Sequence, residues 1–385
     1  MKIVVAIDSF KGSITSLALG EAIELGVKNI YPESEVIKVP IADGGEGTIE
    51  ALVEGTNGEI IEISVKGPLM KPLMAKYGIM GDQKTAVIEM ATASGLPLVS
   101  IKERDPSKTT TFGTGELIKD AIKRGCREFI VGIGGSATND GGLGMLQALG
   151  YKFLDKNKNE LHGCGESLEK IIFIDDKNVI NGLKECKFLV ACDVDNPFYG
   201  ERGAAHVYGR QKGASEEMIL SLDRGLQTFA NTIQRLLNKD INISGGGAAG
   251  GLGGGFSAFL NSTLEPGIDI IIKEVNLLSH IKDADFVITG EGRIDFQSVM
   301  GKAPTGVSKL CKENNIPVIA LAGSVADDAV ATHDYGIDSI FSIMNYPMSL
   351  EDAMDSENTK KLVKKNTEEI FRLIKVCENK FKIKK

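Results

Sequence analysis

Short apolar runs alternate with amphipathic segments at the two ends of the chain. Uninterrupted apolar runs are typical of parallel strands that helices cover on both faces, and an apolar period of three to four residues is typical of helices. The predicted strands are 3–7, 36–39, 60–65, 286–289, 317–321 and 340–343, and the predicted helices are 17–27, 49–53, 305–311 and 327–333. Thr15 or Ser16 should cap the first helix. The pattern predicts an α/β fold with a doubly wound, six-stranded parallel sheet.

The segment 67–283 interrupts this sheet and is long enough to form a domain of its own. It opens with GPLMKP, whose prolines and glycine suit a crossing point between domains. Its own apolar runs include 86–90, 129–133 and 187–191. We therefore predict one domain from residues 1–66 and 284–385, and a second, inserted α/β domain from residues 67–283. The functional motifs are expected in the cleft between the two domains.

Composition narrows the class of protein. The 385 residues are 42% hydrophobic and 25% charged, as in ordinary globular enzymes. A net charge of −8 argues against general affinity for nucleic acid or anionic membranes. No apolar run has the length of a membrane-spanning helix or of a signal-peptide core, and the six cysteines show no CxxC spacing. We expect a cytoplasmic protein with reduced thiols and no nucleic-acid or membrane partner.

A glycine-rich turn follows the predicted strand 129–133. Its residues with ligand-binding potential are Gly134, Gly135, Ser136, Thr138 and Asn139. Glycine has no Cβ and tolerates positive φ, so such a turn and the helix N-terminus behind it let backbone N–H groups approach an anion closely. The turn therefore predicts a phosphate or carboxylate site.

Two other interpretations of this turn stay open. Gly132, Gly134 and Ala137 fit a dinucleotide-binding fingerprint, and Asp155 lies where a ribose-binding acid is expected. Asp140 argues against that interpretation, because an acid in the first helical turn would repel a pyrophosphate. The turn is also explained by a tight connection from strand to helix that binds nothing.

Four polar clusters follow predicted strands: DSFKGS (8–13), ADGGEGT (42–48), CDVDNP (192–197) and TGEGRID (289–295). One such cluster is more often a helix cap or a turn than a reactive site, but four in one chain favour chemistry. Phosphoryl transfer needs cations and N–H groups for phosphate charge, carboxylates for Mg²⁺, and a carboxylate that orients the attacking hydroxyl. The four clusters together supply these groups.

A second glycine tract, 244–259, matches GxGxxG at Gly245, Gly247 and Gly250. The chain contains no GxxxxGK[ST] sequence, so a P-loop mechanism is unsupported. The tract predicts either close packing of a helix against a sheet or backbone that lines the cleft, and both interpretations stay open.

Taken in order, the motifs resemble the bacterial glycerate kinase family, type I. They are DSFKGS, IADGGEGT, GTGELI, GIGGSATNDGG, CDVDNPFYGERGAA, QKGA, GGGAAGGLG and TGEGRID followed by GK, between about residues 3 and 346. The resemblance implies phosphorylation of glycerate by ATP with Mg²⁺, commonly at the 2-hydroxyl to give 2-phosphoglycerate. It also implies a Rossmann-like domain from both chain ends and an inserted α/β domain. Arg210 and Phe296 depart from the family pattern, where proline and serine are usual.

Candidate roles follow from the motifs and the chemistry. Asp193 is the predicted general base because it ends the apolar run 187–191, with Asp195 as second choice. Lys11 should neutralise the transferring phosphoryl oxygens, and Asp295 is the predicted metal ligand. The predicted substrate or nucleotide contacts are Ser9, Asp43, Gly44, Gly45, Gly134, Gly135, Ser136, Thr138, Asn139, Gly246, Gly247, Glu291 and Arg293.

The expected partners are glycerate and ATP, and a homodimer is the candidate assembly. The alternatives are a kinase of another small hydroxy acid, an NAD-dependent 2-hydroxy acid dehydrogenase that uses the turn at 132–137 with Asp155, and a non-enzymatic carboxylate-binding or sensor protein. The sequence leaves open the phosphorylated oxygen, the glycerate enantiomer and which glycine loop holds the nucleotide.

Overall fold

A fully parallel five-stranded sheet joins the two ends of the chain, in a computed structural model that describes residues 1–299 and 301–381. Its strands, in spatial order, are β13 (Ser339–Ser342), β12 (Val318–Val325), β11 (Phe286–Ile294), β1 (Lys2–Val5) and β2 (Glu35–Lys38). This is a common order of doubly wound sheets, 2-1-3-4-5. The winding reverses between β1 and β11, and ligands of such sheets bind at the carboxyl ends of the strands beside the reversal.

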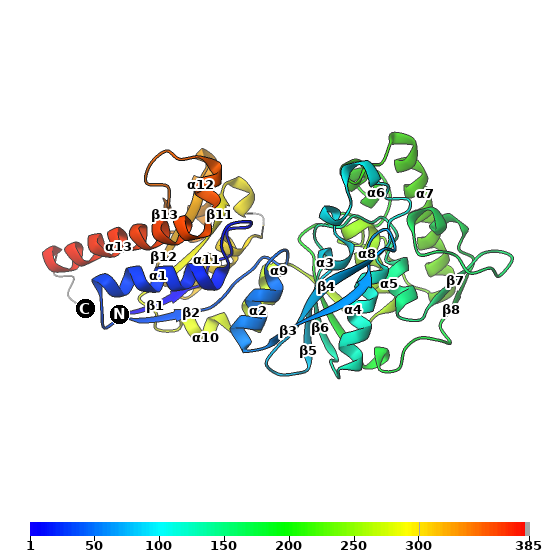
Figure 1. Cartoon of the computed structure of the whole chain (residues 1–385), viewed down its shortest axis with the longest axis horizontal. Helices are drawn as coiled ribbons and strands as arrows, with labels where there is room; N and C mark the ends of the chain where they lie inside the picture. The colour runs from blue at the N-terminus through cyan, green and yellow to red at the C-terminus, as the bar shows by residue number, and fades with distance from the viewer. Residues whose placement is uncertain (300, 382–385) are drawn as a thin grey trace. The chain divides into compact units, whose positions relative to one another are not determined.

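Helices from both ends of the chain cover this sheet. They are α1 (Ser16–Ile30), α2 (Thr48–Thr56), α9 (Gly267–Glu274), α10 (Leu277–Ile281), α11 (Ala303–Glu313), α12 (Leu350–Met354) and α13 (Ser356–Phe381), with 3₁₀ segments η6 (Phe296–Val299) and η7 (Asp327–Tyr335). Thr15 caps α1, because its hydroxyl accepts the N–H of Ala18 at 3.3 Å. Helices α1 and α13 lie side by side in Figure 1, and a Cβ on Gly26 would lie 2.7 Å from the carbonyl oxygen of Lys364.

The predicted third strand of this sheet belongs to a different sheet. Residues 60–65 lie in β3 (Glu59–Lys66), which pairs antiparallel with β4 (Pro72–Ile79) across a short turn. The chain divides accordingly into one compact unit of Met1–Gly55 and Ile268–Lys385 and a second of Thr56–Gly267. Both divisions fall earlier than the predicted 66/67 and 283/284. Alternation marked 60–65 as a strand without indicating its partner, and a short turn favours pairing with the next strand.

The second unit is built on a six-stranded mixed sheet. Its strands, in spatial order, are β10 (Ser262–Glu265), β9 (Lys187–Ala191), β6 (Glu128–Gly132), β5 (Thr85–Glu89), β4 and β3, and all pairs are parallel except those of β4. A separate hairpin consists of β7 (Lys152–Leu154) and β8 (Phe173–Asp175). The helices are α3 (Ala91–Ser94), α4 (Phe112–Lys123), α5 (Leu143–Ala148), α6 (Ala204–Tyr208), α7 (Glu216–Leu237) and α8 (Ala248–Phe259). Phe129 and Phe188 stack in its core with ring centroids 4.7 Å apart.

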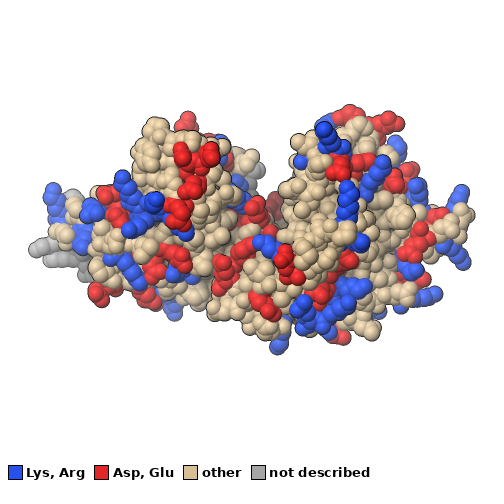
Figure 2. All heavy atoms as spheres, in the orientation of Figure 1, with Lys and Arg blue, Asp and Glu red and all other residues tan. Residues whose placement is uncertain are grey.

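The observed architecture confirms the predicted fold class, a doubly wound parallel sheet from both chain ends with an inserted α/β part. Acidic and basic side chains are interspersed over the face drawn in Figure 2, which carries no large area of one sign. Within residues 1–299 and 301–381, no helix combines the length and the apolar character needed to cross a membrane.

Candidate active site

Four charged side chains gather where the winding of the first sheet reverses. Asp8 and Lys11 follow β1, Asp43 follows β2, and Glu291 lies on β11. The Nζ of Lys11 is 2.9 Å from Oδ2 of Asp43, and Asp8 lies within electrostatic range of the other three charges. We call these four residues the switch-point cluster. They occupy the edge of the sheet where doubly wound folds bind their ligands.

Burial sets the electrostatics of this cluster. Asp8 is 2% exposed, and its Oδ1 accepts the N–H of Ser9 at 2.7 Å. Burial, with the charge of Asp43 added to it, raises the pKa of Asp8 to about 7. Burial alone would lower the pKa of Lys11, but Asp43 and Asp8 outweigh it and the pKa is raised. The cluster therefore holds a charged lysine beside a carboxyl group that binds its proton more tightly than an ordinary aspartate does.

The loops that carry this cluster also hold other predicted site residues. The N–H of Gly45 donates to Oδ1 of Asp43 at 3.0 Å, and Gly44 has a φ of +86° that favours glycine. A Cβ added to Gly47 would lie 3.3 Å from the hydroxyl of Ser9. The loop 42–48 thus packs on the loop 8–13.

Glu291, the member of the switch-point cluster on β11, has two further polar neighbours. The hydroxyl of Ser298 donates to Oε1 of Glu291, and the Nζ of Lys302 lies 3.5 Å from its Oε2. Burial raises the pKa of Glu291, and those two neighbours offset part of this effect. Further along, Arg293 pairs with Asp295 at 3.1 Å. The predicted contacts Glu291 and Arg293 therefore have different settings, one buried and one at the surface.

Asp8 and Asp43 form a pair of carboxyl groups suited to a magnesium ion, besides the predicted ligand Asp295. Both oxygens of Asp295 are engaged, one by Arg293 and one by the N–H of Gln297 at 2.9 Å, and both oxygens of Asp43 are likewise engaged, by Lys11 and by the N–H of Gly45. A cation beside Asp8 and Asp43 would relieve the repulsion between their charges. Mg²⁺ commonly takes one or two carboxylates and completes its shell with water and phosphate oxygens. In the part of the chain that the structure describes, no three His, Cys, Asp or Glu side chains are grouped to hold a metal.

In the second unit the glycine turn, residues 134–139, has an exposed tip and a buried base. Gly134 and Gly135 are exposed, and a Cβ added to Gly134 would meet no atom within 4 Å. Ser136 is 6% exposed, and Thr138 and Asn139 are fully buried. The tip is therefore the part of the turn that a ligand reaches directly.

The helix behind this turn is not open to an anion, contrary to the prediction from its glycines. Asp140 accepts the N–H groups of Gly142 and Gly144 at 3.1 and 3.2 Å, and that of Thr111 at 2.8 Å. This buried carboxyl group caps α5 and ties it to the start of α4. The N–H groups that would bind an anion are already bonded within the protein, and a carboxyl group occupies their position.

The base of the glycine turn contains polar atoms without partners. Among the described residues, Thr138 Oγ1 and both amide atoms of Asn139 are buried and make no hydrogen bond. Buried polar atoms are nearly always paired in native proteins, because leaving one unpaired costs about 1–3 kcal/mol. Unpaired atoms beside an exposed glycine tip mark this turn as a candidate binding element.

Asp193, the predicted base, is the second residue after β9, and its side chain is exposed. Its Oδ1 accepts the N–H of Gly267 at 2.9 Å, which gives the carboxylate a structural role at the first residue of α9. Asp195 pairs with Arg202 at 3.0 Å, and both side chains are largely exposed.

The second glycine tract has a packing explanation at each predicted contact. A Cβ on Gly246 would lie 2.5 Å from the carbonyl oxygen of Ile241, and one on Gly247 would lie 2.1 Å from that of Pro197. A Cβ on Gly250 would lie 2.0 Å from the carbonyl oxygen of Thr138. The tract is therefore closely packed, and its contact with a ligand stays a prediction.

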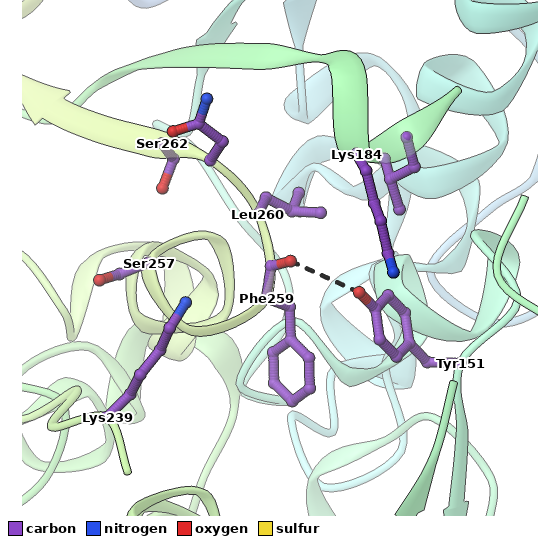
Figure 3. A pocket seen from close by; sticks show the side chains of 9 residues that line it. Tyr151, Lys184, Lys239, Ser257, Phe259, Leu260 and Ser262 are labelled. Carbon is purple, nitrogen blue, oxygen red and sulfur yellow. Dashed lines mark hydrogen bonds between the residues drawn. The ribbon is translucent and has the colours of Figure 1, made fainter. Parts of the chain in front are cut away.

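A pocket of about 460 Å³ in the second unit lies away from these residues (Figure 3). It is lined by Tyr151, Leu183, Lys184, Lys239, Ser257, Phe259, Leu260, Asn261 and Ser262. Lys184 precedes β9 and Asn261 precedes β10, so the pocket is at the amino ends of these strands. The glycine turn and Asp193 follow the carboxyl ends of β6 and β9, which is the opposite edge of the sheet.

The geometry argues against the dinucleotide interpretation. Asp155 follows β7, which belongs to the separate antiparallel hairpin, and its Oδ1 accepts the N–H groups of Asn157 and Asn159 at 2.7 and 2.8 Å. It therefore closes a local turn and does not occupy the ribose-binding position of a βαβ unit.

Two buried charged residues escaped the sequence analysis as site residues. Asp8 was noted only as part of its motif, and Lys212 only as part of QKGA. The Nζ of Lys212 donates to the hydroxyl of Ser136 and the carbonyl oxygen of Thr138, both at 2.7 Å. The sequence offered one signal for both residues: Asp8 lies in DSFKGS and Lys212 in QKGA, and both motifs resemble those of the glycerate kinase family.

The fold and these groups define an α/β enzyme with a charged site at the reversal of a doubly wound sheet. Comparison with known proteins shows to which family of enzymes the chain belongs. The sequence model of the glycerate kinase family matches residues 3–375. The chain is 47% identical to glycerate kinase of Bacillus subtilis (strain 168) over the full length of both proteins. It is 49% identical to glycerate 2-kinase of Escherichia coli (strain K12), over 92% of this chain and 93% of that protein.

A solved structure agrees with the sequence comparisons. The crystal structure of a candidate glycerate kinase 2 from Salmonella typhimurium LT2 superposes with a TM-score of 0.91 at 45% identity, over 98% of this chain and 99% of that one. The chain belongs to the glycerate kinase family, and it is an enzyme of the kinase class.

Proposed function

We propose that this enzyme transfers the γ-phosphoryl group of ATP to the 2-hydroxyl of glycerate and releases 2-phosphoglycerate. The observation that carries the proposal is the switch-point cluster, where a charged lysine and two carboxyl groups meet at the ligand-binding edge of a doubly wound sheet. Phosphoryl transfer relies on positioning and on charge stabilisation, and these groups supply both. The 49% identity to a glycerate 2-kinase supports the choice of oxygen.

The residues of the first unit divide the work by charge. Lys11 stabilises the phosphoryl oxygens, and the loop carrying Ser9 contacts the phosphates together with Gly44 and Gly45. Mg²⁺ would be held by Asp43 and Asp8, and when bound it would neutralise phosphate charge. Glu291 and Arg293 are substrate or nucleotide contacts, and Asp295 acts through Arg293.

The second unit supplies the base and further contacts. Asp193 orients the hydroxyl of glycerate and accepts its proton, because an alcohol attacks poorly without such help. Gly134 and Gly135 offer an unobstructed tip to substrate or nucleotide. Ser136, Thr138 and Asn139 support that tip from beneath. Gly246 and Gly247 pack on the backbone of neighbouring loops and are further candidate contacts of substrate or nucleotide.

The cysteines bear on where the enzyme works. All six thiols are free, and four of them are buried. Free thiols suit a reducing compartment, so we propose that the enzyme acts in the cytoplasm.

Omission assays test the proposal. The enzyme is incubated with glycerate, ATP and MgCl₂, and formation of ADP is followed with each component left out in turn. We expect turnover only with all three. A parallel incubation with NAD and glycerate should give no change in absorbance. Equal formation of ADP without glycerate, or reduction of NAD, would contradict the proposal.

A further inference from the structure

Lys212 is a buried lysine beneath the glycine turn. It ends the 3₁₀ segment η5 (Arg210–Lys212) and is 2% exposed. Its Nζ donates to Ser136 Oγ and to the carbonyl oxygen of Thr138, both at 2.7 Å. Lysine is rarely buried, because removing an ammonium group from water is costly. Folding alone gains little from such an arrangement.

The backbone around Lys212 is constrained on both sides. Arg210 makes an exposed, two-pronged pair with Glu216 at 2.7 and 2.9 Å, which links η5 to the first turn of α7. Gly213 has a φ of +95°, and a Cβ there would lie 2.5 Å from the carbonyl oxygen of Arg104. The backbone on both sides of the lysine is therefore fixed, so Nζ has a defined position.

The carbonyl group of Thr138 is held from two sides. Lys212 donates to its oxygen, and Gly250 of α8 approaches the same oxygen so closely that no side chain fits there. Next to it, the Thr138 hydroxyl and the Asn139 amide have no partners. The buried base of the turn thus keeps its shape through the lysine, through packing and through the N–H of Ala137, which donates to the carbonyl oxygen of Ser94 at 2.9 Å. The Thr138 hydroxyl and the Asn139 amide contribute no hydrogen bond to it.

The pKa of Lys212 lies close to neutral pH. Burial lowers its pKa to about 7, and Asp140 offsets only part of that effect. Asp140 is the carboxyl group that faces it from the α5 side, and Arg104 is the neighbouring cation on the η5 side. An anionic ligand at the turn would favour the charged form of the lysine.

We infer that Lys212 is a positioning residue for phosphoryl transfer, which acts through Ser136 and Thr138 to fix the glycine turn against its ligand. The inference rests on the proposed function, in which the tip of the turn contacts substrate or nucleotide. A displacement of about 1 Å in a positioning element can cost about 100-fold in rate.

Lys212→Met, Ser136→Ala and the double variant test this role in the ATP- and glycerate-dependent assay. Lys212→Met should lower kcat/KM by about 100-fold, and the double variant should lose no more than Lys212→Met alone, because both changes break one interaction. Lys212→Gln, which keeps a donor, should recover part of the loss.

The control is Lys239→Met. Lys239 also donates to a backbone carbonyl oxygen, that of Ala258 at 2.6 Å, but it lines the pocket of Figure 3 and does not contact the glycine turn, so its replacement should leave kcat/KM unchanged.

The outcomes separate this role from plain stability and from the proposed function. The charged form of Lys212 donates to Ser136 and Thr138, so wild-type kcat/KM should fall as the pH rises through about 7. Lys212→Met should lose the part of this fall that belongs to Lys212, while the part that belongs to Asp8 remains in both enzymes. Should Lys212→Met misfold, Ser136→Ala alone must still lower kcat/KM at unchanged thermal stability. Normal kinetics in folded Lys212→Met, or losses that add in the double variant, would overturn the inference. Inactive wild type would instead count against the proposed function.

Discussion

The Nζ of Lys11 lies 2.9 Å from Oδ2 of Asp43, although 45% of the lysine side chain is exposed. An exposed ion pair contributes only about 0–1 kcal/mol to stability. Breaking this pair should therefore cost the fold little. Lys11 is flexible enough to move from Asp43 to a phosphate, and Asp43 is then free for a cation.

Replacing Lys11 with alanine should lower kcat by about 100-fold or more, the loss expected for one transition-state stabiliser. Steady-state kinetics with saturating ATP and glycerate measure it. Lys28→Ala is the matched control, because Lys28 is 46% exposed and pairs with Glu24 at 2.7 Å in the same unit. Wild-type turnover in folded Lys11→Ala would exclude the proposed role.

Gly134→Val should raise KM for ATP or glycerate by about tenfold or more without loss of thermal stability. The fold has room for the side chain, since a Cβ there meets no atom within 4 Å, so any defect reports a ligand. The substrate whose KM rises identifies what this turn binds. Gly55→Ala is the control, where the added Cβ meets only Pro40 at 3.8 Å. Unchanged affinity for both substrates would make the turn purely structural.

Asp193→Asn should lower kcat by about 100-fold while ATP binding, measured by calorimetry, changes little. Asparagine keeps an acceptor for the N–H of Gly267, so α9 should be undisturbed. Asp195→Asn is the control and should remain active. If Asp193→Asn is active while Asp295→Asn is inactive with both substrates bound, the base is the carboxylate that follows β11 instead.

Asp8 should make stability fall as the pH rises. Its pKa is raised from 3.8 to about 7 by burial first and by Asp43 second. The folded state therefore binds this proton more tightly than the unfolded state. The contribution of Asp8 to the free energy of unfolding is complete below pH 3.8 and is lost as the pH rises through about 7. Urea denaturation without Mg²⁺ should show this decline in wild type and a smaller one in Asp8→Asn. Equal slopes would contradict the assignment.

Sequence pattern predicted the strands of the first sheet well, because buried parallel strands are apolar throughout. The run at 3–7 is an example, with Ile3, Val4 and Val5 at most 1% exposed. The pattern could not indicate which sheet received 60–65, since alternation is the same for any partner. Pairing across the turn to β4 decided it.

The site was predictable where chemistry follows a strand directly, as for Lys11 and Asp43. It was not predictable where a group depends on distant contacts. Asp140 holds Thr111, which lies 29 residues earlier, and Lys212 meets Ser136 across 76 residues. The residue type alone would also place Lys212 at the surface, because nearly all lysines are exposed.

The proton-coupled phosphorus NMR spectrum of the product tests the central claim most directly. Wild-type enzyme is incubated with ATP, MgCl₂ and glycerate, and the new phosphate ester signal is recorded. A phosphate on the 2-oxygen couples to the single proton of its carbon and gives a doublet, which is the predicted result. A triplet, from two protons on the 3-carbon, would contradict phosphorylation at the 2-hydroxyl. Absence of any new ester signal would contradict ATP-dependent glycerate kinase activity itself.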